Sequence, residues 1–234
     1  MKEKAIVVVS GGMDSVTLLW DVVKSETYDV EGFSVNYGQR HSKELEFAKK
    51  NCALLGVKHN LIDLSSVGKQ LLKGSALTSD IDVPEGHYSD DNMRITVVPN
   101  RNMILLSLAV GYCESINGKK VFLGSHQGDR AQYPDCRAEF TEAVSKAAKL
   151  GTYNEVEIIS KYNNLMKWDI VKIGHDLGVP YELTWSCYKG VDRPDLKCGT
   201  CTERTEAFAK NNLKDPLLTN EEWEDAVKFL KAVS

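Results

Sequence analysis

The chain has 234 residues, of which 42% are apolar and 26% charged, a composition typical of a globular protein with one sizeable core. Its net charge is −4, and no run of Lys and Arg alternates with aromatic residues, which argues against a dedicated nucleic-acid surface. The apolar stretches at 5–9 and 103–113 are too short for a signal-peptide core and a membrane span. We therefore expect a cytoplasmic protein without membrane contact.

Short apolar runs alternate with amphipathic helical patterns along most of the chain. This alternation is typical of a parallel sheet covered by helices on both faces, the doubly wound α/β class. The expected strands are 4–10, 29–37, 57–64, 119–125 and 155–162, and the expected helices are 15–24, 42–55, 102–116, 137–150, 166–177 and 221–233.

The expected domain organisation is one α/β domain followed by a small helical element. We place the α/β domain at 1–183 and the second element, with its cysteines and terminal helices, at 184–234. Residues 66–98 are too long for an ordinary connection, and an insertion near strand ends is often a lid.

Six cysteines in a reducing compartment are expected to be core thiols or metal ligands. Cys52 and Cys113 fall on apolar helix faces, which predicts plain burial. The Cys-x-x-Cys turn of Cys198 and Cys201 normally supplies half of a tetrahedral metal site.

The first expected strand leads into the sequence Ser10-Gly11-Gly12-Met13-Asp14-Ser15. Two glycines allow a sharp turn with exposed N–H groups, and the helix that follows adds partial positive charge, so this loop suits a phosphate. The alternative is an ordinary turn with Asp14 or Ser15 as a helix cap. The segment lacks the endings of Walker and dinucleotide motifs but resembles the SGG-x-DS signature of ATP pyrophosphatases. That resemblance implies that the loop holds the β and γ phosphates while a nucleophile attacks the α phosphorus.

Further strings extend the resemblance over almost the whole chain. Together with SGGMDS and the terminal Cys-x-x-Cys, the chain is similar to the 7-cyano-7-deazaguanine synthase family, whose fold is a five-stranded sheet of the adenine-nucleotide-hydrolase type. The resemblance implies that ATP activates 7-carboxy-7-deazaguanine, that ammonia displaces AMP to give an amide, and that a second ATP serves its dehydration to the nitrile. The strings are NYGQRHSKELEFAK (36–49), VVPNRNMILLSLA (97–109), GSHQGDRAQYPDCRAEF (124–140), NLMKWDIVKIG (164–174) and TWSCYKG (184–190).

The same resemblance assigns further residues to ATP and to catalysis. Arg40 and His41 follow the second strand and are expected to contact ATP, as is Gly124 after the fourth strand. Arg101 closes the lid against the next helix, and Lys167 is expected near the departing diphosphate. A surface position is the alternative for Arg40 and for Lys167. Asp14, Ser15, Arg101 and Lys167 are the expected catalytic residues.

A guanine-like substrate suggests carboxylates and aromatic rings at the fourth strand's end and beyond. Asp135 fits a helix cap equally well, and Cys136 is expected to be buried because the chemistry needs no covalent thiol. Asn100 stands where the family commonly has Gly, so we expect a positive φ there. The expected substrate-binding residues are Arg101, Asp129, Tyr133, Asp135, Arg137 and Trp185, with Tyr188 as a further candidate for the aromatic wall.

The resemblance also implies a zinc loop of four cysteines, here with one exchanged. Cys187, Cys198 and Cys201 are in register with the family, and Asp195 stands where the second cysteine is expected. Zinc accepts carboxylate oxygen, so these four are the expected metal ligands. Three explanations stay open: a structural zinc site with a tolerated exchange, a site tuned to altered chemistry, and a loop without metal.

The expected cofactors are ATP, Mg²⁺ and Zn²⁺, with Asp14 or Asp129 near the magnesium ion. The nitrogen donor is ammonia or, as in members associated with anti-phage operons, a protein amine that gives an amide. A tRNA thiolase and an ATP-binding sensor are further alternatives; the thiolase would need a basic face that the sequence does not show. The family suggests a homodimer.

Overall fold

In the computed structural model, residues 2–39, 43–79, 81–88, 91–189 and 192–233 are described. Five parallel strands form one sheet in the order β3-β2-β1-β4-β5. The strands are β1 (Glu3–Val8), β2 (Tyr28–Asn36), β3 (His59–Asp63), β4 (Lys120–Leu123) and β5 (Glu157–Ser160). The helices are α1 (Met13–Lys24), α2 (Lys43–Leu54), α3 (Ser65–Leu71), α4 (Arg101–Ser115), α5 (Ala138–Gly151), α6 (Lys167–Leu177), α7 (Gly199–Lys210) and α8 (Asn220–Val233), and the 3₁₀ turns are η1 (Asp91–Thr96), η2 (Gln127–Ala131), η3 (Pro134–Cys136) and η4 (Tyr181–Leu183). The predicted doubly wound fold is therefore confirmed.

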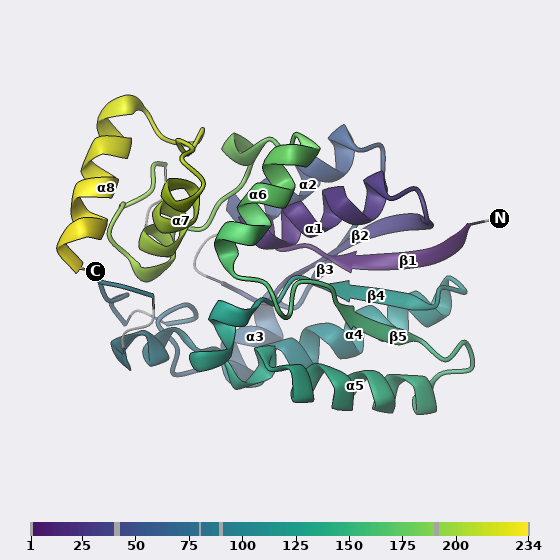
Figure 1. Cartoon of the computed structure of the whole chain (residues 1–234). Coiled ribbons are helices and arrows are strands. Elements are labelled where there is room, and N and C mark those ends of the chain that lie inside the picture. Colours follow the sequence, from purple (N-terminus) through teal and green to yellow (C-terminus); the bar gives the residue numbers. More distant parts are fainter. Residues whose placement is uncertain (1, 40–42, 80, 89–90, 190–191, 234) are drawn as a thin grey trace.

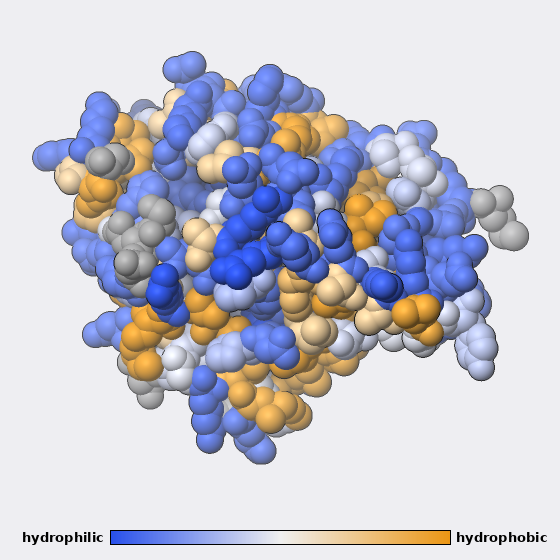
Figure 2. Space-filling view, turned by 60° about the horizontal axis from the view of Figure 1, so that its bottom comes forward, coloured by the Kyte–Doolittle hydropathy of each residue, from blue (hydrophilic) through white to orange (hydrophobic). Residues whose placement is uncertain are grey.

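Helices cover both faces of the sheet, with α1, α2 and α6 on one side and α4 and α5 on the other (Figure 1). Successive residues of a strand point to opposite faces, so Ala5 and Val7 enter the core under α1 and α6, while Ile6 enters the core under α4 and α5. Both faces bury apolar side chains, which explains the unbroken apolar run Ala5–Val8 in the central strand β1. The surface turned forward in Figure 2 mixes hydrophilic and hydrophobic side chains.

The strand order places the topological switch point between β1 and β4. From β1 the chain adds β2 and β3 on one side, then returns through α4 to place β4 beside β1. Loops at the carboxyl ends of these two strands form the usual ligand position of an open α/β sheet. In Figure 1 the arrowheads of β1 and β4 point toward the end of the molecule that carries α7.

The insertion at 66–98 packs onto the loop that carries Cys187, Asp195, Cys198 and Cys201, the cysteine loop. In the described part, Ala76, Leu77 and Val83 share a buried cluster with Trp185 and the three cysteines of that loop. Glu85 also pairs with Cys198 in an isolated β-bridge. The role of the insertion as a lid stays a prediction. The division of the chain at residue 183 also stays a prediction; Phe208 of α7, which lies beyond it, packs in the same core as α1 and α6.

Several local expectations are confirmed by the structure. Asn100 adopts a left-handed conformation at φ 55° before α4. Thr219 or Asn220 is the cap that the sequence predicts for the last helix. Thr219 caps α8, because its hydroxyl accepts from the Glu222 N–H at 3.2 Å while the Glu222 carboxylate accepts from the Thr219 N–H at 2.8 Å. Cys52 and Cys113 are fully buried, and burial raises the pKa of each thiol to about 12. Across the described ranges, no helix combines the length and the apolar character needed to cross a membrane.

Candidate active site

A cavity lies at the carboxyl ends of the strands, beside the switch point. The phosphate loop, the ends of β2 and β4, the start of α4 and the segment before the cysteine loop form its walls. The expected site residues that line it are Ser10, Gly12, Asp14, Ser15, Arg101, Gly124, Asp129, Tyr133, Lys167 and Trp185. Residues from motifs far apart in the sequence thus share one cavity. Arg40 and His41 lie outside the described residues, so their expected contacts with ATP stay predictions.

The phosphate loop is fixed by its own hydroxyl groups. The Ser15 Oγ accepts from the Ser10 N–H at 3.1 Å and donates to the Gly12 carbonyl at 3.1 Å. Gly11 has φ +98°, and a Cβ on it would lie 1.8 Å from the Glu44 carbonyl oxygen, so this position requires glycine. Gly12 is the N-cap of α1 without a side-chain cap, which leaves first-turn N–H groups available for an anion.

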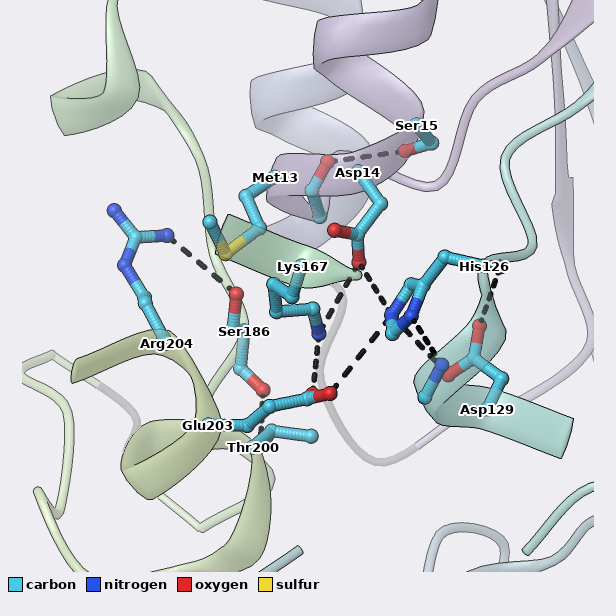
Figure 3. Close-up of polar contacts among 12 residues, drawn as sticks. Met13, Asp14, Ser15, His126, Asp129, Lys167, Ser186, Thr200, Glu203 and Arg204 are labelled. Atoms are coloured by element: carbon cyan, nitrogen blue, oxygen red, sulfur yellow. Dashed lines mark hydrogen bonds and ion pairs between the residues drawn. The ribbon is translucent and has the colours of Figure 1, made fainter. Parts of the chain in front are cut away.

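Lys167 is the cation that faces this loop. Its Nζ lies 3.2 Å from Asp14 Oδ2 and 2.5 Å from Glu203 Oε2 (Figure 3). The residue is only 6% exposed, although it opens α6, which excludes a surface lysine. Burial opposes its charge, but Asp14 and Glu203 outweigh burial and raise the pKa of Lys167 above its usual value. Lys167 is therefore charged beside the phosphate loop at neutral pH.

His126 lies fully buried at the centre of the acidic groups. Its Nδ1 accepts from the Gly128 N–H at 3.0 Å, so the neutral ring carries its proton on Nε2. That atom points toward carboxylate oxygens of Asp129 at 3.5 Å and of Asp14 and Glu203 at 3.9 Å each (Figure 3). These distances are too long for hydrogen bonds. The Nε2 of His126 is therefore buried without a hydrogen-bond partner among the described residues, and it faces the acidic groups of the cavity.

The acidic groups of the cavity fit a divalent cation. Asp129 accepts from the Tyr88 hydroxyl at 3.0 Å and from the backbone N–H of His126 at 3.2 Å. Burial opposes its charge, but His126 and Lys167 together lower the pKa of Asp129. The Oδ1 of Asp14 is buried without a hydrogen-bond partner among the described residues. Ionised carboxylates with a free oxygen suit Mg²⁺, and Asp14 and Asp129 would hold it.

Aromatic side chains and Arg101 form another wall of the cavity. The Tyr133 hydroxyl bonds with Thr96 at 2.9 Å and lies 3.4 Å from the Tyr188 hydroxyl. Trp185 is 1% exposed, and its backbone N–H donates to the Gly11 carbonyl at 3.0 Å. The wall joins the phosphate loop to the cysteine loop. Its tyrosines, Tyr133 and Tyr188, suit a planar ring, whereas the Trp185 ring is already stacked on Phe47 with the ring centroids 6.5 Å apart.

The structure does not bring Asp135 and Arg137 to the cavity. The Asp135 carboxylate accepts from the Asn102 N–H at 2.9 Å, so it caps α4 rather than the helix that follows it in sequence. Arg137 is exposed, and its Nε donates to the Arg130 carbonyl at 3.3 Å. Cys136 lines the cavity, and burial raises the pKa of its thiol, which leaves it un-ionised. As substrate ligands, Asp135 and Arg137 stay predictions that this arrangement does not support.

The four expected metal ligands come together. One ligand atom each of Cys187, Asp195, Cys198 and Cys201 lies within 4.8 Å of the others. The Cys187 Sγ lies 3.3 Å from Asp195 Oδ1 and 3.9 Å from the Cys198 Sγ, and it accepts from the Asp195 N–H at 3.3 Å. Hydrogen bonds from Cys198 and Cys201 lower the pKa of Cys187 to about 4. Three sulfurs and one oxygen at these separations fit a tetrahedral zinc ion.

Four residues of this site were not expected from the sequence: Tyr88, His126, Glu203 and Glu44. Tyr88 comes from the insertion and Glu203 from α7, so only the folded chain brings them to Asp129 and Lys167. Glu44 lines the cavity, and burial raises its pKa to about 7. The sequence pointed to two of them only indirectly: His126 and Glu44 lie inside the strings 124–140 and 36–49 that carry the family resemblance.

Comparisons with known proteins point to one family. The family model described as "Queuosine biosynthesis protein QueC" matches residues 4–212. The chain is similar to 7-cyano-7-deazaguanine synthase of Pseudoalteromonas atlantica, with 52% identity over 93% of this chain and 99% of the relative. The proteins of the same name from Caldicellulosiruptor saccharolyticus and Archaeoglobus fulgidus are 54% and 49% identical, over 92% and 97% of this chain and 94% of each relative.

Proposed function

The chain belongs to the QueC family of 7-cyano-7-deazaguanine synthases and is an ATP-dependent enzyme, and we propose that it converts 7-carboxy-7-deazaguanine to 7-cyano-7-deazaguanine with ammonia as the nitrogen donor. The observation that carries this proposal is Lys167, buried between Asp14 of the phosphate loop and Glu203. A fixed cation at that point suits a departing diphosphate.

In the first step, the substrate carboxylate attacks the α phosphorus of ATP. The bond to the β phosphate breaks and diphosphate leaves toward the N–H groups of Gly12 and α1 and the Lys167 ammonium. Mg²⁺, held by Asp14 and Asp129, would offset phosphate charge when bound. The product is an acyl-adenylate whose ring lies against Tyr133 and Tyr188, with Arg101 at the same wall.

In the second step, the ammonia nitrogen adds to the acyl carbon, AMP leaves with the electron pair of the C–O bond, and a nitrogen-bound proton is lost. A second ATP then adenylylates the amide oxygen, and loss of AMP and of the N–H protons forms the nitrile. The same phosphate loop and Lys167 serve both leaving groups, because each activation releases diphosphate.

The cysteine loop supports zinc as a resident metal, with Asp195 as the oxygen ligand. We place zinc in a structural role, because three of its ligands are buried and share one cluster with Trp185. The cytoplasmic location and the homodimer also remain our expectations for the enzyme.

The test is mass spectrometry of the product, with AMP and bound zinc quantified on the same sample. We expect the nitrile and two AMP per turnover. The Lys167→Gln variant should lose most of its diphosphate release, whereas Lys161→Gln, which removes a 42% exposed lysine paired with Asp21, should keep it.

Other products would contradict this proposal. An amide that does not proceed to the nitrile, or mass added to a protein, would show a conjugating enzyme of the anti-phage kind, and Asp195→Cys would then test whether the altered loop causes it. Failure to release diphosphate with the acid would favour an ATP-binding sensor.

A further inference from the structure

Glu203 lies where α7, the start of α6 and the turn before η2 meet (Figure 3). Its side chain is enclosed, because the residue is 7% exposed and its carboxylate lies 2.5 Å from the Lys167 Nζ and 3.9 Å from the His126 Nε2. A Cβ on Gly128 would come within 3.1 Å of Glu203 Oε1, so the turn packs closely on this carboxylate. The geometry fixes the position of Glu203 from two sides.

The helix that carries Glu203 begins at the cysteine loop. Cys198 is the N-cap of α7, Cys201 is in its first turn, and Glu203 follows two residues later. The next residue, Arg204, anchors the same turn of the helix to Asp215 at 2.6 and 2.8 Å. The first two turns of α7 thus connect the cysteine loop directly to the carboxylate of Glu203.

Lys167 needs two carboxylates to remain at the phosphate loop. A lysine ammonium is a compact charge on a flexible stem, and Asp14 alone fixes it at one point. Glu203 provides the shorter of its two contacts with the described carboxylates. When diphosphate approaches, the second contact keeps Nζ in place while Asp14 is occupied with the cation.

We propose that Glu203 is a positioning residue. It couples the cysteine loop to the ATP site by holding Lys167 against the phosphate loop. This inference rests on the proposed binding of ATP at that loop. Coupling between two sites is reciprocal, so ATP that binds at Lys167 stabilises the metal-loaded loop.

A second connection joins the same two sites and must be separated from the first. The Trp185 N–H donates to the Gly11 carbonyl at 3.0 Å, and Trp185 is two residues from Cys187. This connection is made by the backbone, so it persists when the Glu203 side chain is changed. A variant at Glu203 thus distinguishes the two routes.

The experiment measures zinc release from the zinc-loaded protein to a chromophoric chelator, with and without saturating magnesium-ATP. ATP should slow release from the wild type about fivefold or more, the lower end of typical coupling between sites. Glu203→Gln should abolish the effect of ATP, and Glu203→Asp should restore part of it. Glu206→Gln is the matched control, because Glu206 lies on the same helix and pairs with Lys210 at 2.8 Å; it should keep the full effect.

ATP binding is measured in the same samples by equilibrium dialysis. If ATP binds the wild type but leaves zinc release unchanged, the inference is overturned while the proposed function stands, and this arm needs no variant. If Glu203→Gln binds ATP and keeps the full protection, coupling runs through Trp185 and the inference is also overturned. If ATP does not bind the wild type, the proposed function itself fails.

Discussion

The buried pair of Arg204 and Asp215 should contribute far more to stability than an exposed pair of the same kind. Arg204 is 4% exposed and Asp215 1%, and the guanidinium also donates to the Thr184 hydroxyl at 2.7 Å and the Tyr181 carbonyl at 2.9 Å. Arg204→Met leaves the Asp215 carboxylate buried with the Leu217 N–H as a remaining donor at 3.0 Å. Removal of one partner from a buried ion pair typically costs about 3–5 kcal/mol, and we expect that loss in the free energy of unfolding.

The matched control is Arg193→Met, because Arg193 pairs with Glu222 while it is 48% exposed. Exposed pairs contribute about 0–1 kcal/mol. Both variants are measured by urea unfolding of zinc-loaded protein, followed by tryptophan fluorescence and circular dichroism. Exchange of both buried partners, Arg204→Met with Asp215→Leu, should recover most of the loss because no charge is then stranded. If Arg204→Met costs no more than Arg193→Met, or if the double exchange recovers nothing, the reasoning is refuted.

Three further predictions concern the loops and the cavity. Gly11→Ala should abolish ATP binding, because its Cβ would lie 1.8 Å from the Glu44 carbonyl, whereas Gly151→Ala meets nothing within 4 Å and should leave dialysis-measured affinity unchanged. Asp195→Ala should weaken zinc binding by more than the roughly tenfold typical of losing an outer-shell partner; equal affinity in a chelator competition would show that Asp195 is no ligand. Burial raises the pKa of Glu44 from 4.5 to about 7, so between these values the unfolded state holds fewer protons and wild-type stability falls as pH rises. Glu44→Gln has no such titrating group, so its free energy of unfolding in urea, minus that of the wild type, should be larger above pH 7 than below pH 4.5. A difference that does not change with pH would contradict a raised pKa of Glu44.

Periodicity was enough to predict the five strands and six of the helices, but not α3 or the 3₁₀ turns. The strand and helix patterns depend on neighbours in sequence, as does the left-handed Asn100. The SGG-x-DS segment is likewise local, so its place after β1 could be predicted. Features that depend on sequence neighbours were therefore accessible before the structure.

Groups that depend on packing were not accessible in the same way. Asp135 was weighed as a cap for the helix that follows it, but the fold brings the start of α4 to its carboxylate instead. Glu203 looked like one more charge after the Cys-x-x-Cys turn, and its contact with Lys167 spans 36 positions. The proton on His126 Nε2 follows from an N–H bond that only the folded turn provides.

The distribution of the site along the chain also determines when it is completed during synthesis. Gly11 and Asp14 leave the ribosome first, while their contacts Trp185 and Lys167 follow more than 150 residues later. Glu203, which holds Lys167, follows later still. Until then, a nascent chain has the phosphate loop without the ammonium that opposes the Asp14 charge. Glu203 follows the last cysteine by two residues, so the chain gains its final ATP-site group just after its last metal ligand. The cysteine loop therefore emerges at nearly the same time as the last residue of the nucleotide site.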